Sequence, residues 1–342
     1  MAIPVTKICP SLYHFHQLFL QFSIRSITTL PTLEESVRAA VEAKAYQQIP
    51  EILITSKKTC QNSNPFLFLS TFPQHHRVQV IDEILQSFVP LRPRSRPQFA
   101  YAYLLSYCLQ SPNPFPLALA ILQRTLRTGC IPVPQTHLLL STAWLEQRRQ
   151  SQSVSNILLG MQSIGYRPDS GMCNYLISSL CAVDQLTEAV EVLKGMNMAG
   201  CVPNLESYDA VISALCAVRR TKDVAEKMKE MVKRIGLTPR QETVVKVVRA
   251  MRAKRDIWGA VEMIEFLEKA GFPVGFESYE LVAEGCLECC EFVLAGKVVM
   301  AMAGRGFIPY IRVRLKVVEG LTGVGEHELA SALRQKFLEL KS

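Results

Sequence analysis

The stretch that decides the fold runs from Ser170 to Asn204 and reads SGMCNYLISSLCAVDQLTEAVEVLKGMNMAGCVPN. In its first half, apolar side chains recur at the spacing of one helix face, namely Leu176, Ile177, Leu180 and Cys181. Its second half repeats this arrangement with Ala189, Val190, Val192, Leu193 and Met196. A short polar break joins the halves, which predicts two antiparallel amphipathic helices. Because neither helix can bury its apolar face alone, such a hairpin has to stack on a neighbour.

The signal that closes this hairpin recurs along the chain at a fixed period. Glycine is followed three residues later by proline at Gly129, Gly165, Gly200, Gly236 and Gly306, and a shorter variant joins Gly271 to Pro273. Successive glycines lie 35 or 36 residues apart. Glycine supplies the left-handed turn that ends a helix, and the proline that follows cannot continue it. A period of this length, sustained six times, predicts an array of stacked helical hairpins.

These units resemble pentatricopeptide repeats, on the strength of residues 174–181, 188–189 and 208–216 and of the closures at 165–169 and 200–204. The Trp and Tyr pattern of tetratricopeptide repeats is missing. The resemblance implies an all-α fold, a right-handed αα-superhelix (solenoid) of helical-hairpin repeats. We place the repeat array at residues 98–310, in about six units. We expect residues 31–97 to form degenerate helical repeats or an N-terminal cap, and residues 311–342 to form C-terminal capping helices.

The resemblance also implies single-stranded RNA as the ligand, with about one base bound per repeat. In this family two residues select the base: one in the first turn of the first helix and the last residue of the motif. Here the best pair is Asn174 with Asn204, a combination that the family associates with pyrimidines. The other pairs depart from the family pattern, and they are Asp209 with Arg240, which remain candidates for base reading, Val245 with Gly275, Glu280 with Tyr310, and Leu138 with Asp169. The resemblance therefore supports RNA affinity more than it supports a complete base code.

Positive charge is concentrated in one segment of the chain. The net charge is +8, and residues 219–255 hold 13 Lys and Arg residues against four acids. Such a segment is typical either of a phosphate-contacting stripe or of a solvated outer helix face. The first interpretation gives six candidate contacts to the RNA backbone: Lys222, Lys229, Lys233, Lys246, Arg249 and Arg252.

Neither a metal site nor an active site is predicted. Among the eleven cysteines, Cys286, Cys289 and Cys290 form the tightest cluster, but no second pair of ligands follows to complete a zinc site. Some relatives carry a deaminase-like tail with His-x-Glu and Cys-x-x-Cys zinc ligands, and His327-Glu328 lacks that spacing. We therefore predict no catalytic residues, no metal and no cofactor. This number of free thiols favours a reducing compartment.

The N-terminal segment predicts targeting to an organelle. No acidic residue precedes Glu34, while Lys7 and Arg25 supply positive charge among Ser and Thr residues. This composition resembles a transit peptide, here residues 1–30, with the mitochondrion as the expected destination and the plastid as the alternative. The apolar stretch in this segment carries Tyr, His and Gln, so we expect no membrane span.

Two functions follow from these features. The first is an organellar protein that binds single-stranded RNA and acts in transcript processing, stability or translation by passive occupation of the RNA. The alternative is a protein-interaction scaffold or a mitochondrial ribosome-associated subunit, which the incomplete base code favours. An enzyme is not expected.

Overall fold

The computed structural model describes residues 32–55, 63–111, 113–150 and 153–340. The predicted transit segment, residues 1–30, lies outside the described residues. The chain divides into two compact units at Tyr107, within helix α5, and each unit is described here by itself.

The regular structure of the first unit is helical throughout its described residues. It contains α2 (Leu33–Glu42), η1 (Tyr46–Gln48), α3 (Ile49–Thr55), η3 (Leu67–Thr71), α4 (Gln74–Phe88) and α5 (Gln98–Leu109). Thr32 and Glu35 form a reciprocal capping box that starts α2. The Tyr46 hydroxyl donates a hydrogen bond of 2.7 Å to Glu83 and so ties η1 to α4. The division of this segment into degenerate repeats or a cap stays a prediction.

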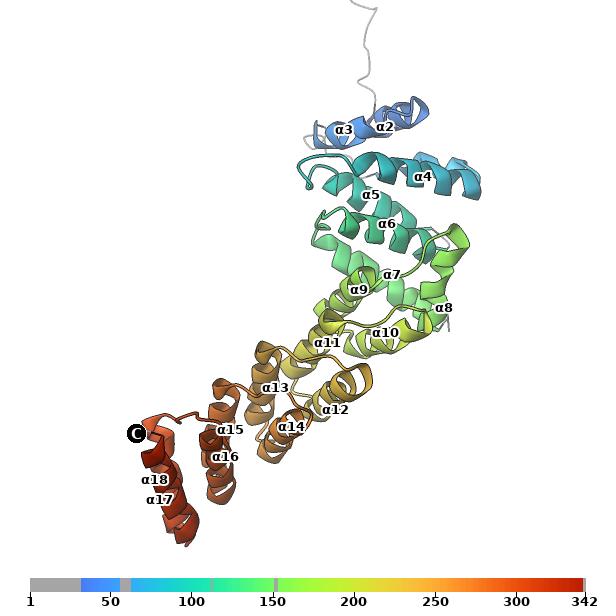
Figure 1. The fold of residues 1–342 in the computed structure, drawn as a ribbon. Coiled ribbons are helices and arrows are strands. Elements are labelled where there is room, and N and C mark those ends of the chain that lie inside the picture. Colours follow the sequence, from blue (N-terminus) through green and yellow to red (C-terminus); the bar gives the residue numbers. More distant parts are fainter. Residues whose placement is uncertain (1–31, 56–62, 112, 151–152, 341–342) are drawn as a thin grey trace, which may run out of the picture. The chain divides into compact units, whose positions relative to one another are not determined.

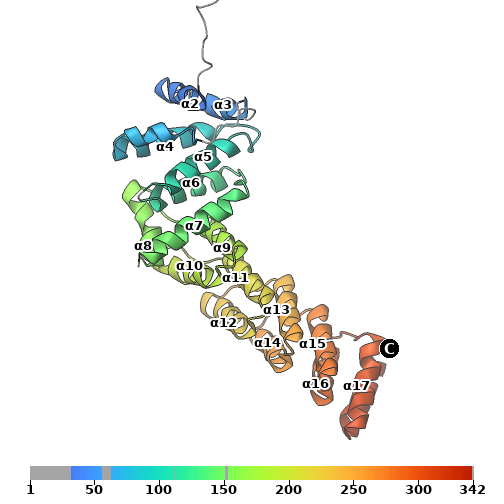
Figure 2. The same ribbon diagram turned by 180° about the vertical axis from the view of Figure 1, so that it is seen from behind.

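The second unit begins with α6 (Phe115–Arg127) and continues as six helical hairpins (Figures 1 and 2). The first helices of these hairpins are α7 (Gln135–Arg149), α9 (Ser170–Ala182), α11 (Leu205–Ala217), α13 (Gln241–Ala253), α15 (Phe276–Glu288) and α17 (Ile311–Gly323). The second helices are α8 (Val154–Leu159) with η4 (Gly160–Ile164), α10 (Leu186–Met198), α12 (Thr221–Glu230) with the π-helical turn η5 (Met231–Ile235), α14 (Ile257–Lys269), α16 (Phe292–Gly304) and α18 (His327–Glu339). No strand occurs among the residues described. The predicted all-α solenoid of hairpins is confirmed.

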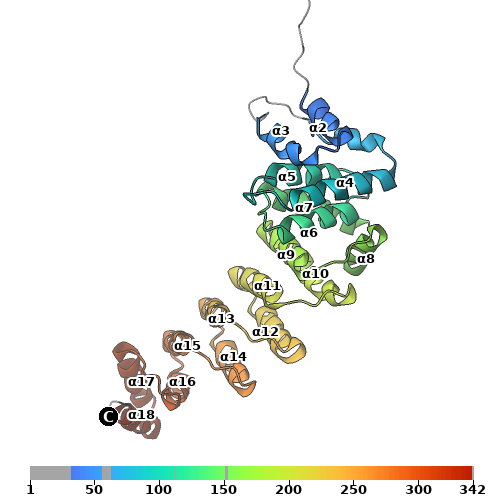
Figure 3. The ribbon, with the colours of Figure 1, turned by 45° about the horizontal axis from the view of Figure 1, so that its top comes forward.

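Successive hairpins stack so that the helices form two layers (Figure 3). Each first helix from α7 to α15 packs against the next first helix, giving a continuous first-helix layer. The second helices form the other layer, which we call the second-helix layer. One apolar core, from Phe115 to Phe337, runs between the two layers. This arrangement buries the apolar faces that the sequence predicts and that no single hairpin can bury alone.

Two large buried aromatic side chains join helices through hydrogen bonds to carboxylates, Trp144 between neighbouring hairpins and Tyr208 within one hairpin. Trp144 and Tyr208 are almost completely buried. The Trp144 indole N–H donates a hydrogen bond of 3.0 Å to Glu188, and the Tyr208 hydroxyl donates one of 3.1 Å to Glu230. Because both partners are carboxylates, the indole and the hydroxyl are buried at little cost in lost hydration.

The six glycines of the predicted period all adopt the left-handed conformation, with φ between 74° and 84°. A second left-handed position, at the end of each first helix from α9 to α17, repeats at the same period. Its residues are Asp184, Arg219, Arg255, Cys290 and Gly325. These five residues share no chemical property, so no sequence pattern indicated their left-handed conformation. The segment after residue 310 thus has the same hairpin geometry as the units before it.

Replacing a left-handed glycine should destabilise the array through the backbone alone. A Cβ atom at Gly200 would meet no atom within 4 Å, but its φ of +74° is strained for any residue with a side chain. We therefore expect Gly200→Ala to cost about 1 kcal/mol of stability and to lower the unfolding temperature measured by circular dichroism. Gly304→Ala is the control, because Gly304 is helical with open space around it and alanine favours helices. Equal unfolding temperatures for the two variants would contradict this account.

Candidate nucleic-acid interface

The residue after the closing proline is the N-cap of the next first helix at α9, α11, α13 and α17. The Asp169 carboxylate accepts a hydrogen bond of 2.9 Å from the Met172 backbone N–H at the start of α9. The Asn204 side chain accepts one of 3.0 Å from the Ser207 backbone N–H at the start of α11. Both side chains satisfy a backbone donor that the helix itself leaves unpaired. The second predicted base-selecting position therefore also caps a helix.

The structure brings the predicted pair Asn174 and Asn204 into direct contact. The Asn174 amide donates hydrogen bonds of 3.1 Å to Asn204 Oδ1 and 3.2 Å to Glu206, and its Oδ1 accepts one of 2.6 Å from the Ser207 hydroxyl. Asn174 is only 9% exposed. The Asn204 amide nitrogen donates to no group among the residues described. In this pair, Asn204 is thus the residue with donors still available to a base edge.

The pair Asp209 and Arg240 repeats this geometry one hairpin further on. The Arg240 guanidinium lies 3.1 Å from the Asp209 carboxylate, and the Thr243 hydroxyl donates a hydrogen bond of 2.8 Å to Asp209 Oδ1. Thr243 is the third residue of α13, as Ser207 is the third residue of α11. In both repeats the fifth residue of one first helix accepts a hydrogen bond from a hydroxyl of the next. These two bonds form a polar ladder between hairpins.

The polar ladder does not extend to the next two pairs of the array. Val245 offers no acceptor, and the buried hydroxyl of Ser278, which holds the third position of α15, has no partner. Glu280 accepts a hydrogen bond of 3.2 Å from the Tyr310 backbone N–H, but its second carboxylate oxygen is buried without a partner. Burial raises the pKa of the Glu280 carboxyl. At the other end of the array, Leu138 is 63% exposed and carries no polar group.

The six basic residues predicted to contact the RNA backbone do not form one stripe. Lys222 and Lys229 lie on α12 and Lys233 on η5, in the second-helix layer, and all three are exposed. The Lys233 ammonium lies 5.2 Å from the centre of the Phe266 ring of α14. The other three candidates lie on α13, in the first-helix layer. The chain reverses at the end of η5, so one basic segment of sequence supplies two separate surfaces.

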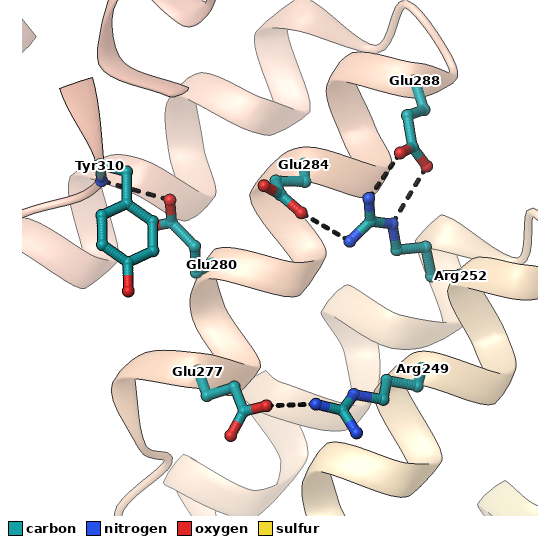
Figure 4. Close-up of polar contacts among 7 residues, drawn as sticks. All are labelled: Arg249, Arg252, Glu277, Glu280, Glu284, Glu288 and Tyr310. Atoms are coloured by element: carbon teal, nitrogen blue, oxygen red, sulfur yellow. Dashed lines mark hydrogen bonds and ion pairs between the residues drawn. The ribbon is translucent and has the colours of Figure 1, made fainter. Parts of the chain in front are cut away.

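Two of the three candidates on α13 are engaged by glutamates of α15 (Figure 4). Arg249 pairs with Glu277 at 2.5 Å, and Arg252 pairs with Glu284 at 2.7 Å and with Glu288 at 2.5 Å. The hydrogen bonds between Arg252 and Glu288 raise the pKa of the guanidinium and lower that of the carboxyl. Bidentate pairs of this kind are among the stronger ones on a protein surface.

Lys246 is the remaining candidate on α13, and it is exposed. Its Nζ lies 3.4 Å from the Ser213 hydroxyl of α11, and no carboxylate pairs with it among the residues described. Of the six predicted cations, Lys246 is therefore the one that combines a place in the first-helix layer with an unneutralised charge.

Further polar and aromatic residues of the first-helix layer were not predicted as contacts. His137 and Tyr175 stack with ring centres 4.7 Å apart, and the His137 Nδ1 lies 2.8 Å from the Ser179 hydroxyl. Burial lowers the pKa of His137, which favours the neutral ring at pH 7. On α17, Arg312 and Lys316 are exposed. Counting helical positions from the start of each first helix would have found all of these residues.

No metal-binding constellation of three or more His, Cys, Asp or Glu side chains occurs among the residues described. Cys286 is fully buried in α15, and Cys290 holds the left-handed position after that helix. Within the same described ranges, no helix has both the length and the apolar character needed to cross a membrane.

Comparisons with known proteins agree with the repeat geometry. A family model described as the PPR repeat family matches residues 168–217. A pentatricopeptide repeat-containing protein of Arabidopsis thaliana is 63% identical over 318 residues, which is 93% of each chain. The crystal structure of the maize pentatricopeptide repeat protein PPR10 is 14% identical, with a TM-score of 0.40, over 97% of this chain and 57% of that chain.

The same maize protein has also been solved in complex with an 18-nt psaJ RNA element. That structure is 16% identical to this chain, with a TM-score of 0.35, over 98% of this chain and 63% of that chain. The chain thus spans about three fifths of the length of the maize protein.

The buried carboxyl of Glu280 gives a pH-dependent prediction. The pKa of this carboxyl is raised in the folded state, above the ordinary glutamate pKa of about 4.3. The free-energy cost of ionising the buried carboxyl is therefore absent at a pH below that ordinary pKa, and it appears as the pH rises. Glutamine keeps the acceptor for the Tyr310 N–H and removes the charge. We expect Glu280→Gln to stabilise the protein by about 1 kcal/mol at pH 7 and to have no effect near pH 4. Denaturant unfolding at both pH values measures this.

The control for Glu280→Gln is Glu277→Gln on the same helix, where the side chain is 58% exposed and paired with Arg249. It should give no gain in stability at either pH. A Glu280→Gln variant that is no more stable than the wild type at pH 7 would show that the carboxyl finds a partner in solution.

Proposed function

Because the chain belongs to the pentatricopeptide repeat family, we propose that it binds single-stranded RNA along the first-helix layer of residues 108–340. The observation that carries this proposal is the repeated contact between the two base-selecting positions. Asn174 and Asn204 meet at 3.1 Å, and Asp209 and Arg240 meet at 3.1 Å in the next repeat. Side chains with amide or charged groups thus recur along one layer at the repeat spacing, as binding of one base per repeat requires.

The pairs differ in what they offer to a base. Asn204 has amide donors available, and Asn174 can exchange its hydrogen bond to Glu206 for one to a base edge, which matches the pyrimidine preference implied by the family. Arg240 is 53% exposed and has several donors, while Asp209 holds it in place. Lys246 supplies an exposed positive charge between these pairs and α15 for the phosphate backbone.

The biological role that fits these features is passive occupation of an organellar transcript, which affects its processing, stability or translation. The acid-free N-terminal segment supports the mitochondrion as the site of action, with the plastid as the alternative. Fusion of residues 1–40 to a fluorescent protein tests this directly. Signal confined to mitochondria is expected, signal in plastids supports the alternative, and a diffuse cytosolic signal contradicts both.

A scaffold or ribosome-associated role is the second candidate, and two observations favour it. First, several candidate positions offer no hydrogen-bond donor to a base. These are Val245 and Glu280, the fifth residues of α13 and α15, and the exposed Leu138 of α7. The second-helix layer exposes Trp258 by 60% and Met198 by 75%, and large apolar side chains of this kind anchor protein partners. Crosslinking in purified organelles separates the two roles, since a scaffold on the ribosome would recover ribosomal RNA rather than a few single-stranded sites.

Lys246 should contact the RNA backbone, whereas Lys229 should not. We expect Lys246→Ala to weaken binding of any single-stranded oligonucleotide and to reduce the slope of log affinity against log salt by about 0.7. Lys229→Ala removes the same charge from the second-helix layer and should leave both quantities unchanged. Fluorescence anisotropy titrations over a range of salt concentrations measure them. If Lys229→Ala has the larger effect, the RNA lies on the other layer.

Asn174 should influence which base is bound. Asn174→Asp removes the amide donors and adds a negative charge beside Glu206, so it should weaken binding to a pyrimidine oligonucleotide by about tenfold. Asn197→Asp makes the same chemical change on the exposed face of α10 and should have no effect. A competition assay with homopolymeric RNAs measures the preference. Identical base preferences in the wild type and Asn174→Asp would remove Asn174 from the binding site.

A further inference from the structure

The solvent-facing row of the first-helix layer changes charge from one helix to the next. In each first helix from α9 to α17 the second, sixth, ninth and thirteenth residues are at least partly exposed. On α9 this row holds no charged residue, and on α11 it holds Glu206 alone. On α13 it holds Glu242, Lys246 and Arg249, and on α17 it holds Arg312, Lys316 and Glu319.

On α15, every charged residue of this row is acidic. Its exposed positions hold Glu277, Glu284 and Glu288 with one leucine, and the buried carboxyl of Glu280 lies on the same helix. We call these four glutamates the acidic row. No Lys or Arg occurs in α15. A phosphate backbone that continued along the layer from α13 to α17 would therefore have to cross a helix that presents only negative charge.

The acidic row also occupies the arginines that precede it. Arg249 is held by Glu277, and Arg252, whose side chain is 22% exposed, is held by Glu284 and Glu288 (Figure 4). A phosphate that bound Arg252 would have to displace two carboxylates and leave them unpaired. Two guanidinium groups pair with the three carboxylates of Glu277, Glu284 and Glu288, so these carboxylates keep an excess of negative charge even when both arginines are paired.

On its other side, the acidic row borders a groove between α15 and α17. This cavity of about 780 Å³ is lined by Glu284 and Glu288 of α15, by Arg312, Lys316 and Glu319 of α17 and by Arg252, which reaches it from α13. The positive charge of Arg312 helps to lower the pKa of Glu288, after the larger effect of Arg252. The cations of α17 therefore act partly on the acidic row, and they lie beyond it for any RNA that approaches from α13.

We propose that the RNA path along the first-helix layer ends at α13, and that the acidic row of α15 ends it. Arg249 and Arg252 serve as counter-charges for that row and not as phosphate contacts. This inference rests on the proposed function and defines its extent. With α7, α9, α11 and α13 in use, the footprint is about four bases at one base per repeat. The hairpins that follow α13 are then left without RNA.

The test compares RNA length dependence in the wild-type full chain and in Glu277→Gln/Glu284→Gln/Glu288→Gln. Labelled oligouridines from about four to about twelve nucleotides are titrated by fluorescence anisotropy at several salt concentrations. Wild-type affinity should stop rising beyond the shortest lengths, apart from the statistical effect of extra binding frames. In the variant, affinity for the longer oligomers should rise about tenfold, and the salt slope should steepen by about 0.7 for each further phosphate that the protein neutralises.

The matched control is Glu191→Gln/Glu262→Gln/Glu265→Gln, which makes the same change in net charge on the second-helix layer. It should leave the length dependence unchanged. Two results would overturn the inference and leave the proposed function standing. One is a control that tightens RNA binding as much as the α15 variant does, and the other is a wild-type affinity that keeps rising with RNA length as the affinity of the variant does. A wild type that binds no oligomer of any length overturns both.

A second measurement does not depend on variants that could misfold. Wild-type protein is bound to a twelve-nucleotide oligomer that carries a photoreactive uridine at each position in turn, and crosslinked peptides are identified by mass spectrometry. Crosslinks should fall on α7, α9, α11 and α13 for every position that crosslinks. Crosslinks on the exposed row of α15 or α17 would show that the RNA continues past the acidic row.

Discussion

The stacking of one hairpin on the next is the interaction on which the rest of this structure depends. Each hairpin has apolar surface on both sides, and the contact between its own two helices covers only part of it. The neighbouring hairpins cover the remainder, which produces one core from Phe115 to Phe337. The strict period of the left-handed glycines follows from this constraint, because a hairpin of different length would misalign both layers.

The same constraint determines what the base-selecting positions can do. The fifth residue of a first helix lies at the contact with the next first helix, so a polar side chain there needs a partner across the stack. Asn174 and Asp209 have such partners in Ser207 and Thr243. Where the partner is missing, as at Glu280, the polar group is buried at a cost. RNA bound as proposed would therefore compete with bonds that also join the hairpins.

Local net charge is a poor guide to available charge in a repeat array. The segment from residue 219 to residue 255 carries the whole positive excess of the chain. The turn between α12 and α13 divides it between the two layers, and the glutamates of α15 then neutralise two of the cations that face the proposed binding surface. What remains for a phosphate backbone is a narrow positive region around Lys246, bounded by an acidic helix.

The sequence by itself determined the class of the fold, the period of the closing glycines and the apolar faces, because these depend on residues close together in the chain. The resemblance of its repeats to pentatricopeptide repeats also paired Asn174 with Asn204, and the structure places the two side chains 3.1 Å apart. Only the tertiary structure revealed the left-handed positions at Asp184 and Arg219, because residues of such different chemistry adopt one conformation there. The partners of Arg249 and Arg252 were likewise decided by which side chains meet across the stack. That meeting depends on side-chain reach between helices about 30 residues apart, which no local pattern encodes.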